Sequence, residues 1–311
     1  MVYLQNENIK KYLQSLHFNA TLENKKILVV VGDSWTNNLY LEENERWAYK
    51  LGLLKGYDIV FNISTNYGSN EEIFTNLLNF FNFKEFYKDD KHNIDRCFFK
   101  TKYNVNNLDV IIGWSTPIRD KSSISYLYQP FNTSTIPNIE ENNNSSLLWT
   151  KYFNDWFNVE YHSYKTQLFI LFLQEYFKIH NVNWYSFMGF TPLVEKEFEN
   201  TKWDLRKFID SSKIFGLYDY PSNMQEYLIK ICHNTIYNDE LPILEMQYME
   251  DNQKINLWTS KFTKLLKFKD KFTKRKEIFD SYTHNKQIFT SDGHPNIVGT
   301  SLIAEFLNKN I

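Results

Sequence analysis

The sequence predicts an α/β protein with a central parallel sheet of about five strands, on three observations. Residues 27–31 form a continuous Ile-Leu-Val-Val-Val run, which is typical of a strand buried on both faces. Two more apolar runs, 57–63 and 108–112, follow at intervals that leave room for a helix each. The 311 residues are 42% hydrophobic and 23% charged, a globular composition long enough to bury a sizeable core.

The first half of the chain alternates strands with helices. Residues 42–55 have helical spacing and stop at Gly56. A turn at 66–70 leads into a second helical stretch at 71–81. Strand, helix, strand, helix, strand is the order of a parallel sheet with right-handed crossovers.

The rest of the chain adds to this core. Residues 1–25 predict an N-terminal amphipathic helix or arm, and residues 26–311 a single domain with insertions within 119–280 that shape the mouth of a site. Further elements are expected as a hairpin at 126–131, an aromatic helix at 147–179, strands at 182–188 and 213–217, a mostly helical stretch at 222–280, and a closing helix at 296–308.

Composition and charge exclude several classes of function. A formal net charge of -2 gives no overall attraction to nucleic acid or to anionic membranes. The two cysteines exclude a disulfide framework. Residues 1–20 lack the apolar stretch of a secretory signal, and no apolar run approaches the ~20 residues of a membrane helix. We therefore expect cytoplasmic synthesis, no membrane span and no nucleic-acid partner.

The chain also lacks the sequence signatures of common cofactors. No histidine or cysteine has a recognised metal-ligand spacing, and neither a Walker nor a Rossmann glycine motif is present. No metal or cofactor is therefore expected. The basic stretch 261–276 is compatible with an acidic partner or nucleic acid, but the solvated face of a helix is the favoured interpretation.

Residues able to do chemistry follow the predicted strands. Ser34, Gly68 and Ser115 come after the first, second and third strands, and Asp292 and His294 stand just before the last helix. Because doubly wound sheets bind ligands outside the C-terminal ends of their strands, we expect these residues to meet. Serine is a weak nucleophile until a base takes its proton, and the base needs a carboxylate to orient it. The pattern predicts a triad of Ser34, His294 and Asp292.

The neighbours of these residues complete the predicted site. The backbone N–H groups of Ser34 and Gly68, with the hydroxyl of Ser115, are the expected donors to an oxyanion. Asp33 is expected to bond turn amides instead of taking part in chemistry. The expected substrate-binding residues are Trp35, Asn70, Trp114 and Arg119.

Three segments resemble sequence blocks of the SGNH/GDSL hydrolases. Residues 31–35, Val-Gly-Asp-Ser-Trp, are similar to the first block, in a Gly-Asp-Ser-Trp form. Residues 66–70, Asn-Tyr-Gly-Ser-Asn, resemble the second block, whose glycine donates to the oxyanion. Residues 291–296, Ser-Asp-Gly-His-Pro-Asn, resemble the last block, which supplies Asp and His. Each motif is weak alone; their order and their placement at strand ends are more specific.

The resemblance implies a flavodoxin-like three-layer fold and a serine esterase that acts through an acyl-Ser34 intermediate without a cofactor. By analogy with glycan esterases of the family, it favours a carbohydrate O-acetyl ester as substrate. Two departures stand out: Ser115 occupies the place of the asparagine in the family's Gly-x-Asn-Asp block, and the spacing is Asp-x-His instead of Asp-x-x-His. Both resemble variants of phage- and virus-encoded members, which suggests a virion or homo-oligomeric assembly.

Two other functions remain open at this point. A catalytically silent virion or glycan-binding protein on the same fold would explain the altered third block. A lipase-like enzyme would have a broad apolar groove formed by the insertion. Ser34 as a helix cap and Ser115 as a passive turn residue are the corresponding structural interpretations.

Overall fold

The computed structural model describes most of the α/β core of the chain. The described residues are 1–5, 8–9, 11–12, 21–38, 40–66, 68–82, 102–115, 159–189, 192–194, 199–219, 221–237, 288–290 and 294–311. Asp292, Arg119, the hairpin expected at 126–131 and the basic stretch 261–276 lie outside them.

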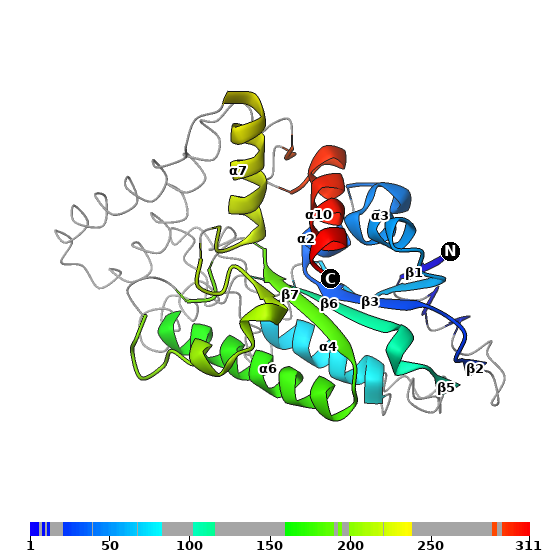
Figure 1. Ribbon diagram of the computed structural model, residues 1–311, viewed down its shortest axis with the longest axis horizontal. Helices are drawn as coiled ribbons and strands as arrows, with labels where there is room; N and C mark the ends of the chain where they lie inside the picture. Colours follow the sequence, from blue (N-terminus) through cyan, green and yellow to red (C-terminus); the bar gives the residue numbers. More distant parts are fainter. Residues whose placement is uncertain are drawn as a thin grey trace, which may run out of the picture.

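A six-stranded parallel sheet runs through the centre of the molecule (Figure 1). Its strand order is β1 (Val2–Gln5), β4 (Ile59–Asn62), β3 (Ile27–Gly32), β6 (Leu108–Trp114), β7 (Asn183–Met188) and β8 (Ile214–Phe215). Every neighbouring pair is parallel. A separate parallel pair joins β2 (Thr21–Leu22) to β5 (Lys102–Tyr103). The predicted α/β class with a parallel sheet is confirmed, with six strands where about five were expected.

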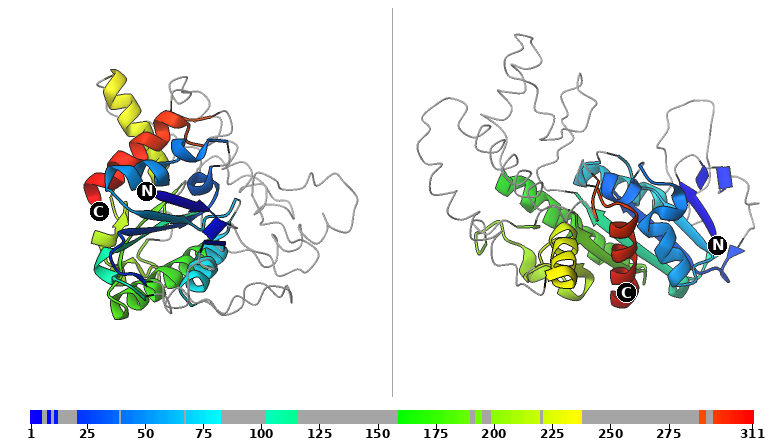
Figure 2. Two further views of the ribbon diagram at one scale, coloured as in Figure 1. Left: turned by 90° about the vertical axis from the view of Figure 1, so that its right-hand side faces the viewer. Right: turned by 90° about the horizontal axis from the view of Figure 1, so that it is seen from above.

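Helices cover both faces of the sheet, so the molecule has three layers (Figures 1 and 2). One face carries α4 (Asn70–Asn82) and α6 (Val159–Ile179), and the other α3 (Trp47–Leu54), α7 (Met224–Tyr237) and α10 (Ile297–Asn310). Short helical turns are α2 (Ser34–Asn37), η1 (Glu43–Glu45), η3 (Val105–Asn107), η6 (Arg206–Phe208) and η7 (Ser211–Lys213).

The central strand β3 explains why its sequence is apolar without alternation. Ile27, Val29 and Val31 pack into the core between the sheet and helices α4 and α6, whereas Leu28 and Val30 pack into the core on the other face of the sheet. All five are fully buried. Successive side chains of a strand point to opposite faces, so a strand covered by helices on both sides must be apolar at every position.

The N-terminal segment differs from the prediction. Val2–Gln5 is a strand that extends the sheet beside β4, with Val2 opposite Ile59 and Gln5 opposite Asn62. These residues therefore belong to the core sheet and not to a helical arm. The predicted helix is present at 8–9 and 11–12. A four-residue edge strand is too short for periodicity to separate from the helix that follows.

The strand order reverses beside β3. From β3 the chain passes through α3 to β4, on the side toward β1, and then through α4 to β6 on the opposite side of β3. In doubly wound sheets, ligands bind at this switch point, outside the carboxyl ends of the strands. Ser34 directly follows the β3 turn and Ser115 directly follows β6, so both lie at the switch point.

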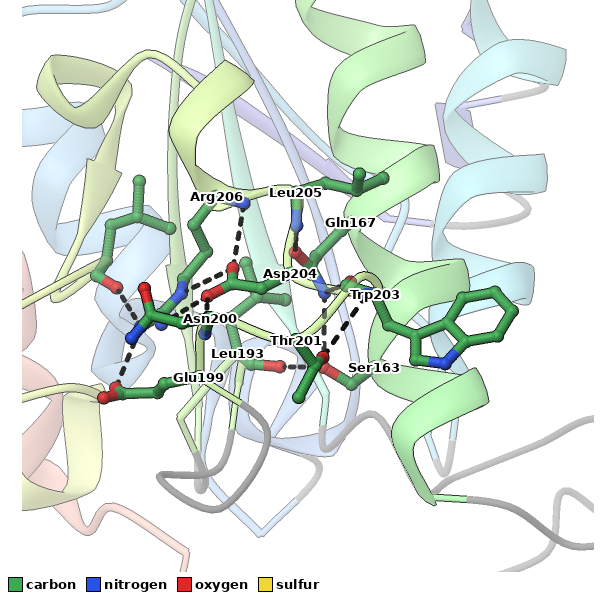
Figure 3. Close-up of polar contacts among 11 residues, drawn as sticks. Ser163, Gln167, Leu193, Glu199, Asn200, Thr201, Trp203, Asp204, Leu205 and Arg206 are labelled. Carbon is green, nitrogen blue, oxygen red and sulfur yellow. Dashed lines mark hydrogen bonds and ion pairs between the residues drawn. The ribbon is translucent and has the colours of Figure 1, made fainter.

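Polar side chains of α6 hold the segment that joins β7 to β8 (Figure 3). Gln167 donates to the carbonyl of Trp203 at 3.2 Å and accepts from the N–H of Leu205 at 2.6 Å. Ser163 donates to the carbonyl of Leu193 at 2.6 Å. The residues that leave β7 are thus fixed against the same helix that borders the switch point.

A buried ion-pair cluster closes this segment on itself (Figure 3). The Arg206 guanidinium lies 2.8 Å from the carboxylate of Asp204 and 3.2 Å from that of Glu199. Hydrogen bonds from Arg206 lower the pKa of Asp204 to about 2, against burial, which raises it. Both charges of the main pair are therefore kept and satisfied in the interior.

Candidate active site

Ser34 stands at the first position of a tight helical turn that begins where β3 ends. Asp33 precedes it, and the Asp33 carboxylate accepts a hydrogen bond from the N–H of Trp35 at 3.0 Å, as expected for a turn-forming residue. Asn38 ends the turn with φ 34°, in the left-handed region, and its N–H donates to the carbonyl of Ser34 at 2.7 Å. Ser34 is 7% exposed, so its hydroxyl sits at the edge of the core.

Two glycines let this turn rest directly on the sheet. Gly32 and Gly113 are opposite one another at the ends of β3 and β6. A Cβ built at Gly32 would lie 2.1 Å from Thr36 Oγ1, and one at Gly113 would lie 2.6 Å from the same atom. Any side chain at either position would lift the α2 turn, and Ser34 with it, away from the strand ends.

The loop after β4 brings Gly68 to the same place. The N–H of Thr65 donates to the carbonyl of Gly32 at 3.0 Å, which continues the ladder past the end of β4. A Cβ at Gly68 would lie 2.6 Å from Thr65 Oγ1 and 3.8 Å from the Gly32 carbonyl oxygen. The backbone of Gly68 therefore lies beside the strand that ends two residues before Ser34.

Asn70 fixes the backbone that follows β6. Its side-chain oxygen accepts from the N–H of Ser115 at 2.8 Å, and its side-chain nitrogen donates to the Ser115 carbonyl at 3.1 Å. The same nitrogen lies 3.1 Å from the Thr166 hydroxyl of α6. Asn70 is 3% exposed. The amide assigned by sequence to substrate binding thus makes its bonds inside the protein, and it holds Ser115 at a fixed place.

Asn70 bonds both backbone groups of Ser115, whereas the Ser115 hydroxyl has no described hydrogen-bond partner. The residue is fully buried, and its Oγ has no hydrogen-bond partner among the described residues. An unpaired buried hydroxyl costs free energy unless something else uses it. This makes the hydroxyl a candidate donor to a substrate oxygen, and a substrate would have to displace what now covers it.

The segment carrying His294 packs against the Ser34 turn, although some 260 residues separate them in the chain. The side chain of Asn38 donates to the carbonyl of Pro295 at 2.7 Å. The ring of Tyr40 lies 5.6 Å from the ring of His294. The N–H of Thr290 donates to the His294 carbonyl at 2.8 Å, which closes the segment into a narrow loop.

Aromatic packing reinforces this contact. Trp35, the neighbour of Ser34, lies with its ring 5.8 Å from that of Phe289. Asn296 then caps α10, accepting from the N–H groups of Val298 and Gly299 at 2.9 and 3.1 Å. The segment that carries His294 is thus held on one side by the Ser34 turn and on the other by the start of α10.

Two predicted substrate-binding residues are buried. Trp35 is 1% exposed and Trp114 is fully buried, so both side chains pack inside the protein in this structure. Arg119 and the predicted orienting carboxylate of Asp292 lie outside the described residues. Of the predicted site, the structure brings together Ser34, Gly68 and Ser115 at three neighbouring strand ends.

Sequence reasoning missed the residues that connect these parts. Asn38 joins the Ser34 turn to the His294 segment, and Tyr40 lies against the His294 ring. The only sequence signal was the Asn-Asn pair at 37–38, because asparagine tolerates the left-handed conformation that ends the turn. Nothing in the sequence says which distant carbonyl an asparagine will meet.

The described part of the chain contains no group of three or more His, Cys, Asp or Glu side chains that could hold a metal ion. Within the same residues, no helix is long and apolar enough to cross a membrane.

Comparisons with known proteins add two distant structures. No protein-family model and no curated protein matches the sequence. A member of the lipolytic protein G-D-S-L family from Veillonella parvula DSM 2008 is similar at 9% identity and a TM-score of 0.29, over 90% of this chain and 94% of that chain. A protein from Desulfitobacterium hafniense DCB-2, assigned to the same family, is similar at 13% identity and a TM-score of 0.22, over 52% and 77%. Similarity at this level carries no argument about function, which rests on the site.

Proposed function

We propose that the protein is a serine ester hydrolase with Ser34 as nucleophile and His294 as base. The observation that carries this proposal is a hydrogen bond between the two segments. The side chain of Asn38, at the end of the Ser34 turn, donates to the carbonyl of Pro295, the residue after His294, at 2.7 Å. This hydrogen bond holds the segment that carries His294 against the turn that carries Ser34, as a base acting on Ser34 would require. Asp292, two residues before His294, is the proposed orienting carboxylate.

The reaction follows the general scheme of acyl transfer. His294 takes the proton of the Ser34 hydroxyl as its oxygen attacks the ester carbonyl carbon, and the carbonyl oxygen becomes an oxyanion. The N–H groups of Ser34 and Gly68 stabilise that charge. The C–O bond breaks, the alcohol leaves with the proton from His294, and an acyl-Ser34 ester remains. Water, deprotonated by His294, then releases the acid and restores Ser34.

The proposed substrate is a carbohydrate O-acetyl ester. Its support is the resemblance of residues 31–35, 66–70 and 291–296 to the SGNH/GDSL blocks, within which glycan esterases occur. Relative kcat/KM on p-nitrophenyl esters of increasing chain length separates the choices. A preference for acetyl supports the proposal, whereas a preference for long chains favours the lipase-like alternative.

Replacement of the nucleophile gives the first prediction. Ser34→Ala should lower the turnover of p-nitrophenyl acetate by ~10³-fold or more, because it removes the hydroxyl that is proposed to form the acyl-enzyme. Ser211→Ala changes an exposed serine of η7 far along the chain and should leave turnover unchanged. If the wild-type protein and both variants are folded and equally inactive, the proposal fails in favour of the silent glycan-binding alternative.

Replacement of Ser115 tests the third oxyanion donor. Ser115→Ala should lower kcat by roughly 10²–10³-fold without loss of stability, because the Ser115 hydroxyl has no bond to lose among the described residues. Ser186 of β7 is a matched control: it too is fully buried with a hydroxyl that has no described partner, but it lies within the strand, opposite Ile112 of β6. Equal kcat for Ser115→Ala, Ser186→Ala and the wild type would make Ser115 a passive turn residue.

A further inference from the structure

Arg46 places a buried guanidinium next to the proposed site. It precedes α3 and is 6% exposed. Its Nε and Nη2 donate to the carbonyl of Leu41 at 3.2 and 3.1 Å, and its Nη1 donates to the side-chain oxygen of Gln5. Among the described residues, no carboxylate lies within ion-pair distance of Arg46. A buried charge left without a counter-charge is expensive, so a reason for it should be sought.

The first branch from Arg46 runs to the nucleophile turn. Gln5, which accepts from Arg46, donates through its side-chain nitrogen to Asn37. Asn37 donates in turn to the side-chain oxygen of Asn66 at 3.2 Å. Asn37 lies three residues after Ser34, so both share one face of the turn, and Asn66 lies two residues before Gly68. Every donor in this chain points the same way, from the cation toward the Gly68 loop.

The second branch runs to the base. The Leu41 carbonyl that accepts twice from Arg46 ends a short segment, and the Leu41 N–H donates to the Asn38 carbonyl at 3.2 Å. Asn38 contacts Pro295, and Tyr40 contacts the His294 ring. One guanidinium therefore bonds to the segment that touches the base and, through Gln5, to the turn that carries the nucleophile.

No described carboxylate forms an ion pair with Arg46, although the carboxylate of Glu43 also acts on the Tyr3 hydroxyl at longer range. The hydroxyl of Tyr3 is the nearest acidic group of β1, and burial raises its pKa, although a hydrogen bond from Asn62 and the charge of Arg46 oppose that rise. Tyr3 is therefore neutral at physiological pH. Hydrogen bonds from a cation are stronger than neutral ones, and bonds in series polarise one another. The cation thus strengthens each of the side-chain hydrogen bonds that run from Gln5 through Asn37 to Asn66.

We propose that Arg46 is a positioning residue for catalysis, which sets the Ser34 turn, the Gly68 loop and the His294 segment relative to one another through Gln5–Asn37–Asn66 and Leu41. The inference rests on the proposed function and extends it to residues that do not touch substrate. It also gives β1 a role: the edge strand delivers Gln5, the only described link between Arg46 and Asn37, to the carboxyl edge of the sheet.

Gln5→Glu is an isosteric test of this role. The introduced carboxylate pairs with Arg46 but cannot donate to Asn37, so the chain breaks while the arginine gains a counter-charge. Stability should be unchanged or higher. The kcat for p-nitrophenyl acetate should nevertheless fall about 10–100-fold, with KM little changed, because small misplacement of catalytic groups is costly. A purely structural arginine predicts the opposite: unchanged kcat in Gln5→Glu, which would overturn the proposal.

Gln174→Glu is the matched control. Gln174 of α6 also uses both ends of its amide, to the carbonyl of Phe208 at 3.2 Å and the N–H of Asp210 at 2.8 Å, but it is not part of the site. Its kcat should equal that of the wild type. An equal loss of kcat in both variants would mean a general effect of added charge and would overturn the role of Arg46.

Hydrogen–deuterium exchange tests the positioning without turnover. Peptides containing 34–41 and 288–296 should exchange several-fold faster in Gln5→Glu than in the wild type and Gln174→Glu, since both segments depend on the same bonds. Equal exchange in all three proteins would overturn the network. If the wild type hydrolyses no ester, the proposed function fails, and the exchange result still decides whether Arg46 couples the two segments.

Discussion

Two arginines of this protein are equally buried and differently paired. Arg46 and Arg206 are each 6% exposed. Arg206 has two carboxylates, Asp204 at 2.8 Å and Glu199 at 3.2 Å, and lies 5.3 Å from the centre of the Tyr218 ring. Arg46 bonds to the Leu41 carbonyl and the Gln5 amide, both neutral, and to no carboxylate among the described residues.

The difference shows what each region of the molecule needs. Away from the switch point, Arg206 serves to close the segment between β7 and β8, and burial there is offset by full pairing. For Arg206 the bonds to Asp204 and Glu199 outweigh burial and raise its pKa. Beside the Ser34 turn, a carboxylate paired with the arginine would weaken the polarisation of the neighbouring amides by the cation. Arg206 is thus paired in the scaffold, whereas Arg46, which we propose positions the site, has no ion pair among the described residues.

The largest expected effect is the difference in the free energy of unfolding between the variants that replace Arg206 and Arg46. Arg206→Met leaves the Asp204 carboxylate without its cation, with only the backbone N–H groups of Asn200 and of residue 206 as partners, and should lower the free energy of unfolding by about 3 kcal/mol. Arg46→Met removes bonds to neutral acceptors and should cost only about 1–3 kcal/mol. Chemical denaturation measures both. Equal losses would break the comparison, since they would mean that Arg46 also relies on a counter-charge.

The effect on kcat should be larger for Arg46→Met than for Arg206→Met, the reverse of the order in stability. At temperatures where each variant is folded, Arg46→Met should lower kcat for p-nitrophenyl acetate by about tenfold or more, because the Ser34 turn and the His294 segment lose their common support. Arg206→Met should leave kcat near that of the wild type. A fall in kcat only for Arg206→Met would contradict the division between scaffold and site.

An effect of intermediate size is expected on the stability of the protein at acidic pH. The Asp204 pKa of about 2 lies below its usual value of 3.8, so its pairing stabilises the fold fully above about pH 4 and is lost as the pH falls toward 2. The contribution should be about 2 kcal/mol. Asp204→Asn should lower stability at pH 7 and flatten the loss between pH ~4 and ~2 relative to the wild type. An acid transition of unchanged steepness in this variant would mean that other carboxylates cause it.

The smallest effect should come from the second partner of Arg206. The side chain of Glu199 is 39% exposed, and exposed ion pairs contribute little. Glu199→Gln should therefore change the free energy of unfolding by less than about 1 kcal/mol. A loss as large as that of Asp204→Asn would show that the cluster acts as a unit and not as one strong pair with an outer partner.

The core of the fold could be predicted because it depends on local rules. The run 27–31 predicted β3, the spacing of 71–81 predicted α4, and apolar runs predicted β6 and β7 close to where they lie. The edge strand β1 could not be predicted, because four residues hold too little periodicity and its partner β4 is more than 50 residues away. The aromatic helix predicted at 147–179 is described from Val159 to Ile179.

The candidate site could be predicted in part, for a related reason. Ser34, Gly68 and Ser115 could be placed at one edge of the sheet because each follows a buried parallel strand, and their roles there stay predictions. Trp35 and Trp114 were assigned to the substrate, but both are buried in the packing. Sequence gives the strand position of a side chain but not whether a helix will cover it.

The sequence by itself determined the parallel sheet, the strand ends that carry Ser34, Gly68 and Ser115, and the turn capped by Asp33. Only the tertiary structure decided that Asn38 meets Pro295, that Asn70 binds both backbone groups of Ser115, and that Arg46 reaches Gln5. The physical reason is the range of the interactions. Hydrophobic periodicity and caps act over a few residues, whereas a side-chain hydrogen bond can join any two positions that the packed fold brings within 3 Å or so.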